Sequence, residues 1–226
     1  MLSVGVAIVA LGLHENPAIA LVVGAASGIG APVVLADYVR HRGQALQERL
    51  YATWGGSPTT LRLRHAGEPA QVEVRDRLRA CVSEVTGVPL PKEAQGRLTP
   101  ARADAAYAEA VAQLVRLTRD KQDFPLVFEE NKNYGYARNL LAMRPLGISL
   151  GIASCATLTT ACALSLSRLI SLPLINVSAG AVVDALILGA WLIVPSAAHV
   201  RRAGEAFADR LFEASWTLLK ARSGSV

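Results

Sequence analysis

The chain has few charged residues and few cysteines for its length. Three Cys in 226 residues cannot form the disulfide framework of a small secreted scaffold. Charged residues make up 18% of the chain and hydrophobic residues 52%, a balance too apolar for an ordinary soluble protein. The abundance of apolar residues also excludes a disordered chain. With a disulfide scaffold, an ordinary soluble protein and a disordered chain excluded, we expect an integral membrane protein.

The charged residues that are present gather in one part of the sequence. Most of the Lys and Arg residues, and most of the Asp and Glu residues, lie between positions 40 and 144. The stretch 146–198 contains only Arg168 and Asp184 as charged side chains. This pattern predicts an all-α integral membrane protein with a polar, mostly helical insert.

Three segments have about the length that a helix needs to cross a bilayer, which is about 20 residues. They are 18–36, 146–167 and 174–198, and Asp184 is their only charged residue. The apolar segment 1–13 would reach only about 20 Å as a helix, so it must cross thinned bilayer, lean on neighbouring helices or stop short. We therefore expect about four transmembrane helices.

The predicted organisation has four parts. Residues 1–39 hold the first two membrane segments, 40–144 a cytoplasmic helical domain, 145–200 the third and fourth membrane segments, and 201–226 a cytoplasmic amphipathic helix. This last helix could lie on the membrane, pack on the insert or pair with another subunit. We expect it to pack on the insert, because its acidic residues dilute the basic face that a lipid-surface helix needs.

Positive charges flank the predicted spans on one side. They are Arg40 and Arg42 after the second span, Arg144 before the third, and Arg201 and Arg202 after the fourth, with Arg168 alone on the other side. Cytoplasmic loops accumulate Lys and Arg, so the insert and both termini are predicted to face the cytoplasm from the inner membrane. The net charge of +5 favours anionic lipid headgroups as partners over a nucleotide, and we expect no specific nucleic acid.

A glycine-rich stretch at residues 19–30, I-A-L-V-V-G-A-A-S-G-I-G, resembles the first strand and glycine turn of short-chain dehydrogenases. That family also needs a Tyr-x-x-x-Lys pair, and none of the four Lys residues has a Tyr four positions before it. We therefore interpret Gly24 and Gly28, like Gly147 and Gly151, as small-residue pairs that let helices approach closely in lipid.

The insert contains several helix signals. A helix is predicted to continue from the second span to Trp54, where a Gly-Gly-Ser-Pro turn ends it. A second helix, about 70–86, has Val74 on its apolar side and Arg79 on its charged side. A third begins at Pro100, and after a turn at Pro125 a final helix enters the third span at position 145.

Two segments of the insert concentrate residue types that bind ligands. The first, 54–65, combines an aromatic ring, hydroxyls and guanidinium groups, and the second, 128–139, combines aromatics, amides and an arginine. The predicted ligand-binding residues are Trp54, Arg62, Arg64, Tyr134, Tyr136 and Arg138. The alternative is an ordinary turn in the first segment and a helix start with interfacial tyrosines in the second.

The same two segments contain W-G-G-x-P-T-T and Y-G-x-x-R-N. In these stretches the chain is similar to small bacterial integral-membrane proteins that carry the same loop. The resemblance covers the insert alone and implies a membrane location. It brings no known activity and assigns a role to no residue.

Patterns typical of catalysis or metal binding are missing from the sequence. The four His lack metal-ligand spacing, and no C-x-x-C or P-loop occurs. We therefore expect no catalytic residue, no metal and no cofactor. The exception inside the membrane is Asp184, because an ionised carboxylate there is costly and marks a pathway or a partner. Asn176 is predicted to share its face, and the structural alternative is an Asp184 that locks helices together.

The sequence predicts an oligomeric membrane effector. Its insert would sense a small anionic ligand, with a nucleotide as one candidate, or a cytoplasmic protein, and its spans would gate a pore or perturb the bilayer. The analogy is with small bacterial membrane proteins of stress and antiphage defence. A homo-oligomer is expected because spans this rich in small residues would leave cavities in a monomer. The alternative is a membrane-anchored scaffold that recruits partner proteins.

Overall fold

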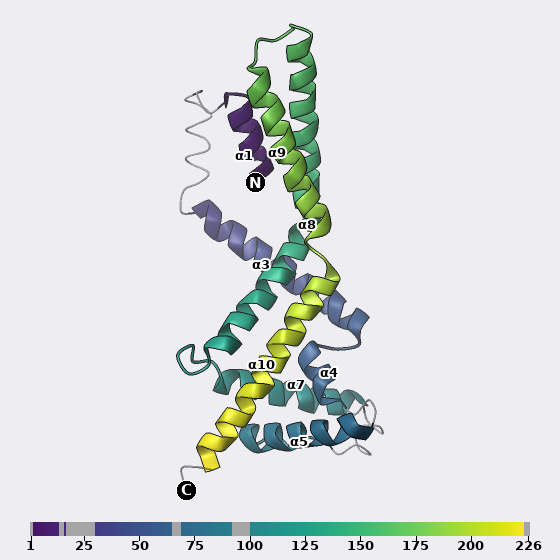
Figure 1. Cartoon of the computed structure of the whole chain (residues 1–226). Helices are drawn as coiled ribbons and strands as arrows, with labels where there is room; N and C mark the ends of the chain where they lie inside the picture. Colours follow the sequence, from purple (N-terminus) through teal and green to yellow (C-terminus); the bar gives the residue numbers. More distant parts are fainter. Residues whose placement is uncertain (1, 14–15, 17–29, 65–68, 92–99, 224–226) are drawn as a thin grey trace. The chain divides into compact units, whose positions relative to one another are not determined.

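The computed structural model describes residues 2–13, 16, 30–64, 69–91 and 100–223 (Figure 1). Within these ranges the chain is helical and contains no strand, so the predicted all-α class is confirmed. Most of the second predicted span, with Gly24 and Gly28, lies outside the described residues.

Two helices are long and apolar enough to cross a membrane: α8 (Pro125–Leu166) and α9 (Leu174–Ile193). Only 28% of the apolar stretch of α8 and 17% of that of α9 is buried within the chain. The core helix of a soluble protein would be mostly buried. The low burial therefore favours lipid as the surroundings of these helices.

Contacts divide the chain into two compact units. Unit 1 comprises Met1–Leu46 and Arg138–Ser196, and unit 2 comprises Gln47–Ala137 and Ala197–Val226. Two helices, α3 (Gly30–Trp54) and α8, contribute residues to both units.

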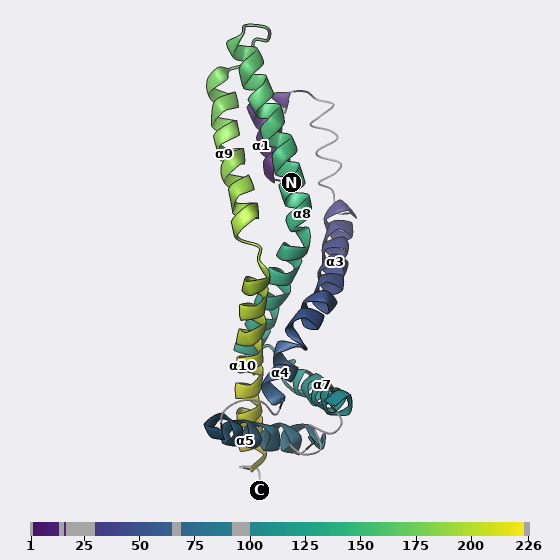
Figure 2. The ribbon, with the colours of Figure 1, turned by 90° about the vertical axis from the view of Figure 1, so that its right-hand side faces the viewer.

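In unit 1 the short helix α1 (Leu2–Ala10) packs on α9, as Figures 1 and 2 both show. The contact depends on small residues, since a Cβ added at Gly180 would lie 2.6 Å from the Cβ of Ala10. Leu158, Ala161 and Val177 complete this apolar cluster. The first apolar segment thus packs on a neighbouring helix within unit 1.

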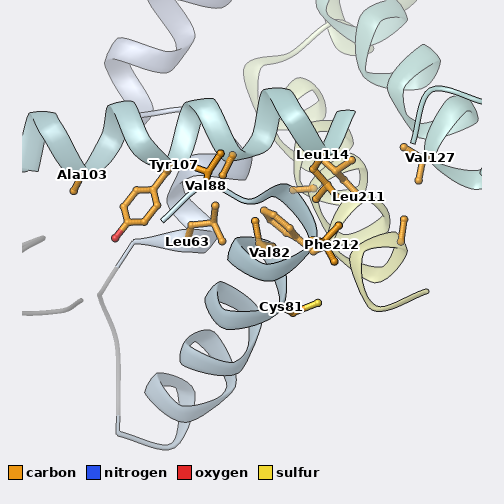
Figure 3. Packing of buried hydrophobic residues seen from close by; sticks show 14 residues of the cluster. Leu63, Cys81, Val82, Val88, Ala103, Tyr107, Leu114, Val127, Leu211 and Phe212 are labelled. Carbon is orange, nitrogen blue, oxygen red and sulfur yellow. The ribbon is translucent and has the colours of Figure 1, made fainter. Parts of the chain in front are cut away.

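Unit 2 is built from α4 (Pro58–Leu63), α5 (Pro69–Thr86), α7 (Pro100–Leu117) and α10 (Ala197–Ser223). These helices bury one apolar core (Figure 3): Leu63, Val82, Val85, Tyr107, Leu114, Leu211 and Phe212. Because α10 supplies part of this core, the C-terminal helix packs on the insert as predicted.

Local signals set several helix limits. Ser57 caps α4 by accepting a hydrogen bond from the backbone N–H of Thr60, and Pro58 occupies the first helical position. Gly87, with φ of 73°, follows the last residue of α5 in the left-handed conformation. The predicted ends at Trp54 and near residue 86 are therefore confirmed.

Three predicted limits are wrong. Pro125 begins α8 instead of forming a turn, because proline fits the first turn of a helix. As predicted, the same helix enters its apolar stretch at Pro145, and the Ser149 hydroxyl donates a hydrogen bond to the carbonyl of Pro145. Helix α9 ends at Ile193, short of the predicted limit at position 198, because Pro195 cannot donate the next helical hydrogen bond. α10 begins directly afterwards at Ala197, ahead of the predicted start at position 201.

Candidate functional site

Asp184 lies on the buried face of α9, together with Val177 and Gly180. Its exposed fraction is 0%, and neither carboxylate oxygen has a hydrogen-bond partner among the described residues. Cys155 on α8 lies near it, but the thiol does not meet hydrogen-bond geometry with either oxygen. Asp184 is thus a fully buried carboxyl group without a compensating donor.

The antiparallel register of α8 and α9 shows what surrounds this carboxyl group. Gly147 lies beneath the ring of Trp191, and a Cβ at Gly151 would lie 2.9 Å from Cδ1 of Leu188. One turn further along α8, Ser154 is buried and donates a hydrogen bond of 2.8 Å to the carbonyl of Ser3. At the height of Asp184 along α9, helix α8 therefore packs against α9, and the first residues of α1 lie close to α8.

Asn176 does not share this environment. It is exposed, whereas the buried positions of α9 are Val177, Gly180 and Asp184. Eight positions along an α-helix turn through about 80° beyond two full turns, which is enough to move a side chain off a narrow buried face. The prediction that Asn176 shares the face of Asp184 is therefore wrong.

Arg64 is engaged inside unit 2. Its guanidinium group pairs with Asp104 through two hydrogen bonds, Nε to Oδ1 at 2.7 Å and Nη2 to Oδ2 at 2.5 Å. These bonds to Asp104 raise the pKa of Arg64 above its ordinary value. A Cβ at Gly56 would lie 3.2 Å from Nη2 of Arg64, so the arginine covers the Gly-Gly turn. Its geometry is that of a cross-link between this turn and α7.

Two of the predicted aromatic residues serve packing. The hydroxyl of Tyr134 lies 2.9 Å from the hydroxyl of Tyr51, whose ring is in turn 6.1 Å from that of Trp54. The ring of Tyr134 also covers Gly204, where a Cβ would lie 3.2 Å from Cε2. These contacts tie α3, α8 and α10 together within unit 2.

The other predicted residues do not gather around them. Tyr136 is exposed, and Arg138, which belongs to unit 1, donates a hydrogen bond of 3.3 Å to Oδ1 of Asn139. Of the six predicted ligand residues, only Arg62 lines the groove that the structure forms in unit 2.

This groove, of about 620 Å³, lies between α5 and α10. It is lined by apolar and charged side chains from three helices: Arg62, Val74, Arg75, Leu78, Asp209, Phe212, Glu213 and Trp216. At one edge Nη2 of Arg62 lies 2.8 Å from Oδ1 and 3.0 Å from Oδ2 of Asp209. The negative charges of Asp209 and Glu213 would repel a polyanion such as a nucleotide from this groove.

Sequence reasoning missed the groove because its walls are far apart in the chain. The residue that marks the groove most clearly is Val74. The sequence predicts it on the apolar, buried side of α5, but its side chain is 67% exposed and lines the groove. The converse error concerns Arg79, which was expected on the charged side and is 5% exposed. Arg79 lies inside because its Nη1 donates a hydrogen bond of 2.9 Å to the carbonyl of Leu63.

The described residues contain no group of three or more His, Cys, Asp or Glu side chains that could hold a metal ion. The two features that stand out chemically are therefore the buried carboxyl group of Asp184 and the groove of unit 2. No family model, curated protein or solved structure matches the chain.

Proposed function

We propose that this protein is a multi-pass membrane effector with a proton-binding site at Asp184. Four segments cross the membrane, unit 2 and both termini lie in the cytoplasm, and the spans respond to a partner that unit 2 binds. The apolar helices α8 and α9 support a membrane location, and the one-sided distribution of flanking arginines supports the orientation. Because α3 and α8 contribute to both units, a change in unit 2 acts on helices that continue into unit 1.

The observation that carries this proposal is the unpartnered burial of Asp184. Proteins pair nearly all buried polar groups, and an ionised carboxylate in an apolar interior costs several kcal/mol. Nothing among the described residues donates a hydrogen bond to this carboxylate. An ionised carboxylate would be the only charge on α9 and costly in apolar surroundings, and this cost is why the proposal gives Asp184 a functional role.

Dicyclohexylcarbodiimide tests the protonated state directly, because it modifies protonated carboxyl groups in apolar surroundings. The carboxyl oxygen adds to the carbodiimide carbon, the acid proton moves to a carbodiimide nitrogen, and the adduct rearranges to a stable N-acylurea. The full chain in lipid vesicles should be modified at Asp184, as mass spectrometry of its peptides would reveal. Lack of modification at pH 7, with α9 shown to be accessible to the reagent at a Val182→Asp control, would contradict the proposal.

Flux measurements test the effector role. A pH-sensitive dye trapped in vesicles should report proton flux with the wild-type chain and none with Asp184→Asn. Asn176→Leu is the matched control on the same helix, because Asn176 is exposed and should not affect flux. Equal flux through wild type and Asp184→Asn would remove Asp184 from the pathway.

A second candidate function is a membrane-anchored scaffold that recruits partners through unit 2. The groove favours it, since Val74 and Trp216 leave apolar surface exposed there. On this alternative Asp184 is structural. Asp184→Asn would then alter the assembly of the chain in detergent, and neither the variant nor the wild type would carry protons.

A further inference from the structure

One side of α3 changes from apolar to cationic along the helix. Val34, Tyr38 and Arg42 follow one another at intervals of four residues, which places their side chains on the same side of a helix. Val34 is 70% and Tyr38 is 48% exposed, and Arg42 is exposed as well. The guanidinium carbon of Arg42 lies 5.9 Å from the centre of the Tyr38 ring. An apolar, an aromatic and a cationic side chain therefore form one exposed row on α3.

This row lies at the depth of the lipid headgroups in the membrane orientation proposed above. The uncharged segment 18–36 ends two residues before Tyr38 and six before Arg42, which is about 3 Å and about 9 Å along a helix. Headgroups occupy about 5–8 Å on each side of the apolar core of a bilayer, and tyrosine is enriched at this boundary. Side chains on a helix tilt toward its N-terminus, which brings the guanidinium group of Arg42 back toward the headgroup layer.

The positive charges around this row are not balanced within their part of unit 1. The side chain of Asn139 on α8 lies against Gly43, so the segments 30–46 and 138–150 meet. These segments contain four arginines and a single carboxylate, Asp37, which leaves a net formal charge of +3. Asp37 lies five positions before the arginine of the row, and so on another side of α3. None of the ion pairs between described residues includes that arginine, so an anion from outside the chain can bind it.

We propose that the row of α3 binds the headgroup of an anionic phospholipid. Arg42 donates hydrogen bonds to the lipid phosphate, because a guanidinium group that stacks on an aromatic ring keeps its N–H donors available. Tyr38 lies beside the glycerol, and an acyl chain covers Val34. A soluble phosphate has no apolar part to cover Val34, so the row favours a lipid over a free phosphate. The net charge of +3 favours an anionic headgroup over a zwitterionic one.

This inference rests on the membrane location in the proposed function and is independent of Asp184. Flotation of the full chain with phosphatidylcholine vesicles tests that location separately. A chain that floats with these vesicles but shows no preference for an anionic lipid contradicts the inference alone. A chain that remains in the aqueous fraction contradicts the proposed function and the inference together.

Native mass spectrometry of the full chain in detergent measures the lipid preference. Phosphatidylglycerol and phosphatidylcholine are added with the same acyl chains, and we expect the wild type to retain more of the first. Arg42→Gln should lower the retention of phosphatidylglycerol about fivefold, whereas Arg42→Lys should keep most of it because the charge remains. The matched control is Arg116→Gln, which removes the same charge from an exposed position of α7 and should leave retention unchanged. Equal retention of the two lipids, or an equal loss in Arg42→Gln and Arg116→Gln, would overturn the proposal.

A competition experiment distinguishes the lipid from a free phosphate. Glycerol 3-phosphate has a phosphate group but no acyl chain, so nothing in it covers Val34. At the same concentration as the lipid and in the same detergent, it should leave the bound phosphatidylglycerol in place. Displacement of the lipid would show that the site binds a free phosphate, which overturns the proposal.

Discussion

Replacing Gly180 by alanine should push α1 away from α9. The new Cβ would lie 2.6 Å from the Cβ of Ala10, whereas carbon atoms in contact are normally about 3.5–4.0 Å apart. Neither atom can rotate away, because each is fixed to a helix backbone, so the two helices must separate by about 1 Å. Overpacking of this kind costs about 1–3 kcal/mol, and alanine regains up to about 1 kcal/mol of helix propensity over glycine. With the full propensity gain the net loss is up to about 2 kcal/mol, and relative to a Gly→Ala change without the clash it is about 1–3 kcal/mol.

Thermal unfolding of the full chain in detergent, followed by far-UV circular dichroism, measures this effect. Gly189→Ala is the matched control on the same helix, because nothing lies within 4 Å of a Cβ there, and its Tm should be unchanged or higher. Adding Ala10→Gly to Gly180→Ala should recover stability, since the single methyl group then sits on the other side of the contact. If Gly180→Ala is as stable as Gly189→Ala, α1 does not pack on α9 as described.

Two further predictions concern unit 2. Arg79→Leu should lower the free energy of unfolding by about 1–3 kcal/mol in urea titrations, because the buried carbonyl of Leu63 loses its donor. Arg77→Leu, which removes only an exposed pair with Glu73, should change it by less than about 0.5 kcal/mol. Burial raises the pKa of the Cys81 thiol above its ordinary 9.0 and that of Tyr107 above its ordinary 10.0. The folded chain therefore keeps both protons where the unfolded chain loses them, so stability is complete below pH 9.0 and falls as the pH rises further. Urea titrations across this range should show the fall, and Cys81→Ala should make it shallower.

Local sequence signals predicted the helix ends at Trp54 and near residue 86 because their causes lie within a few residues. The glycine turn after Trp54 and the left-handed Gly87 act on their own helices and need no tertiary contact. A proline normally breaks a helix, yet α8 continues through Pro145 because long apolar helices can tolerate the loss of one backbone hydrogen bond.

Positions governed by distant contacts could not be predicted in the same way. Arg79 is charged, which is typical of a surface residue, but its side chain is buried because it donates a hydrogen bond to a carbonyl of α4. Arg62 and Arg64 have the chemistry of anion-binding residues, yet each is paired with a carboxylate from another helix, Asp209 and Asp104 respectively. Helical spacing cannot reveal such partners, because they are set by which helices meet.

Asp184 differs from the other buried polar groups in a way that argues for function over packing. The hydroxyl of Tyr107 also lacks a partner, but it is neutral, so its burial costs only about 1–3 kcal/mol. Arg144 has an unpartnered Nε, yet its Nη2 still donates a hydrogen bond of 2.8 Å to the carbonyl of Leu192. Asp184 differs from both, since its two oxygens are buried and have no hydrogen-bond partner among the described residues, on a helix apolar enough to cross a membrane. A Leu or an Asn at this position would avoid the cost of a buried charge. The unpartnered burial of this carboxyl group is therefore the observation on which the proposed role of Asp184 depends.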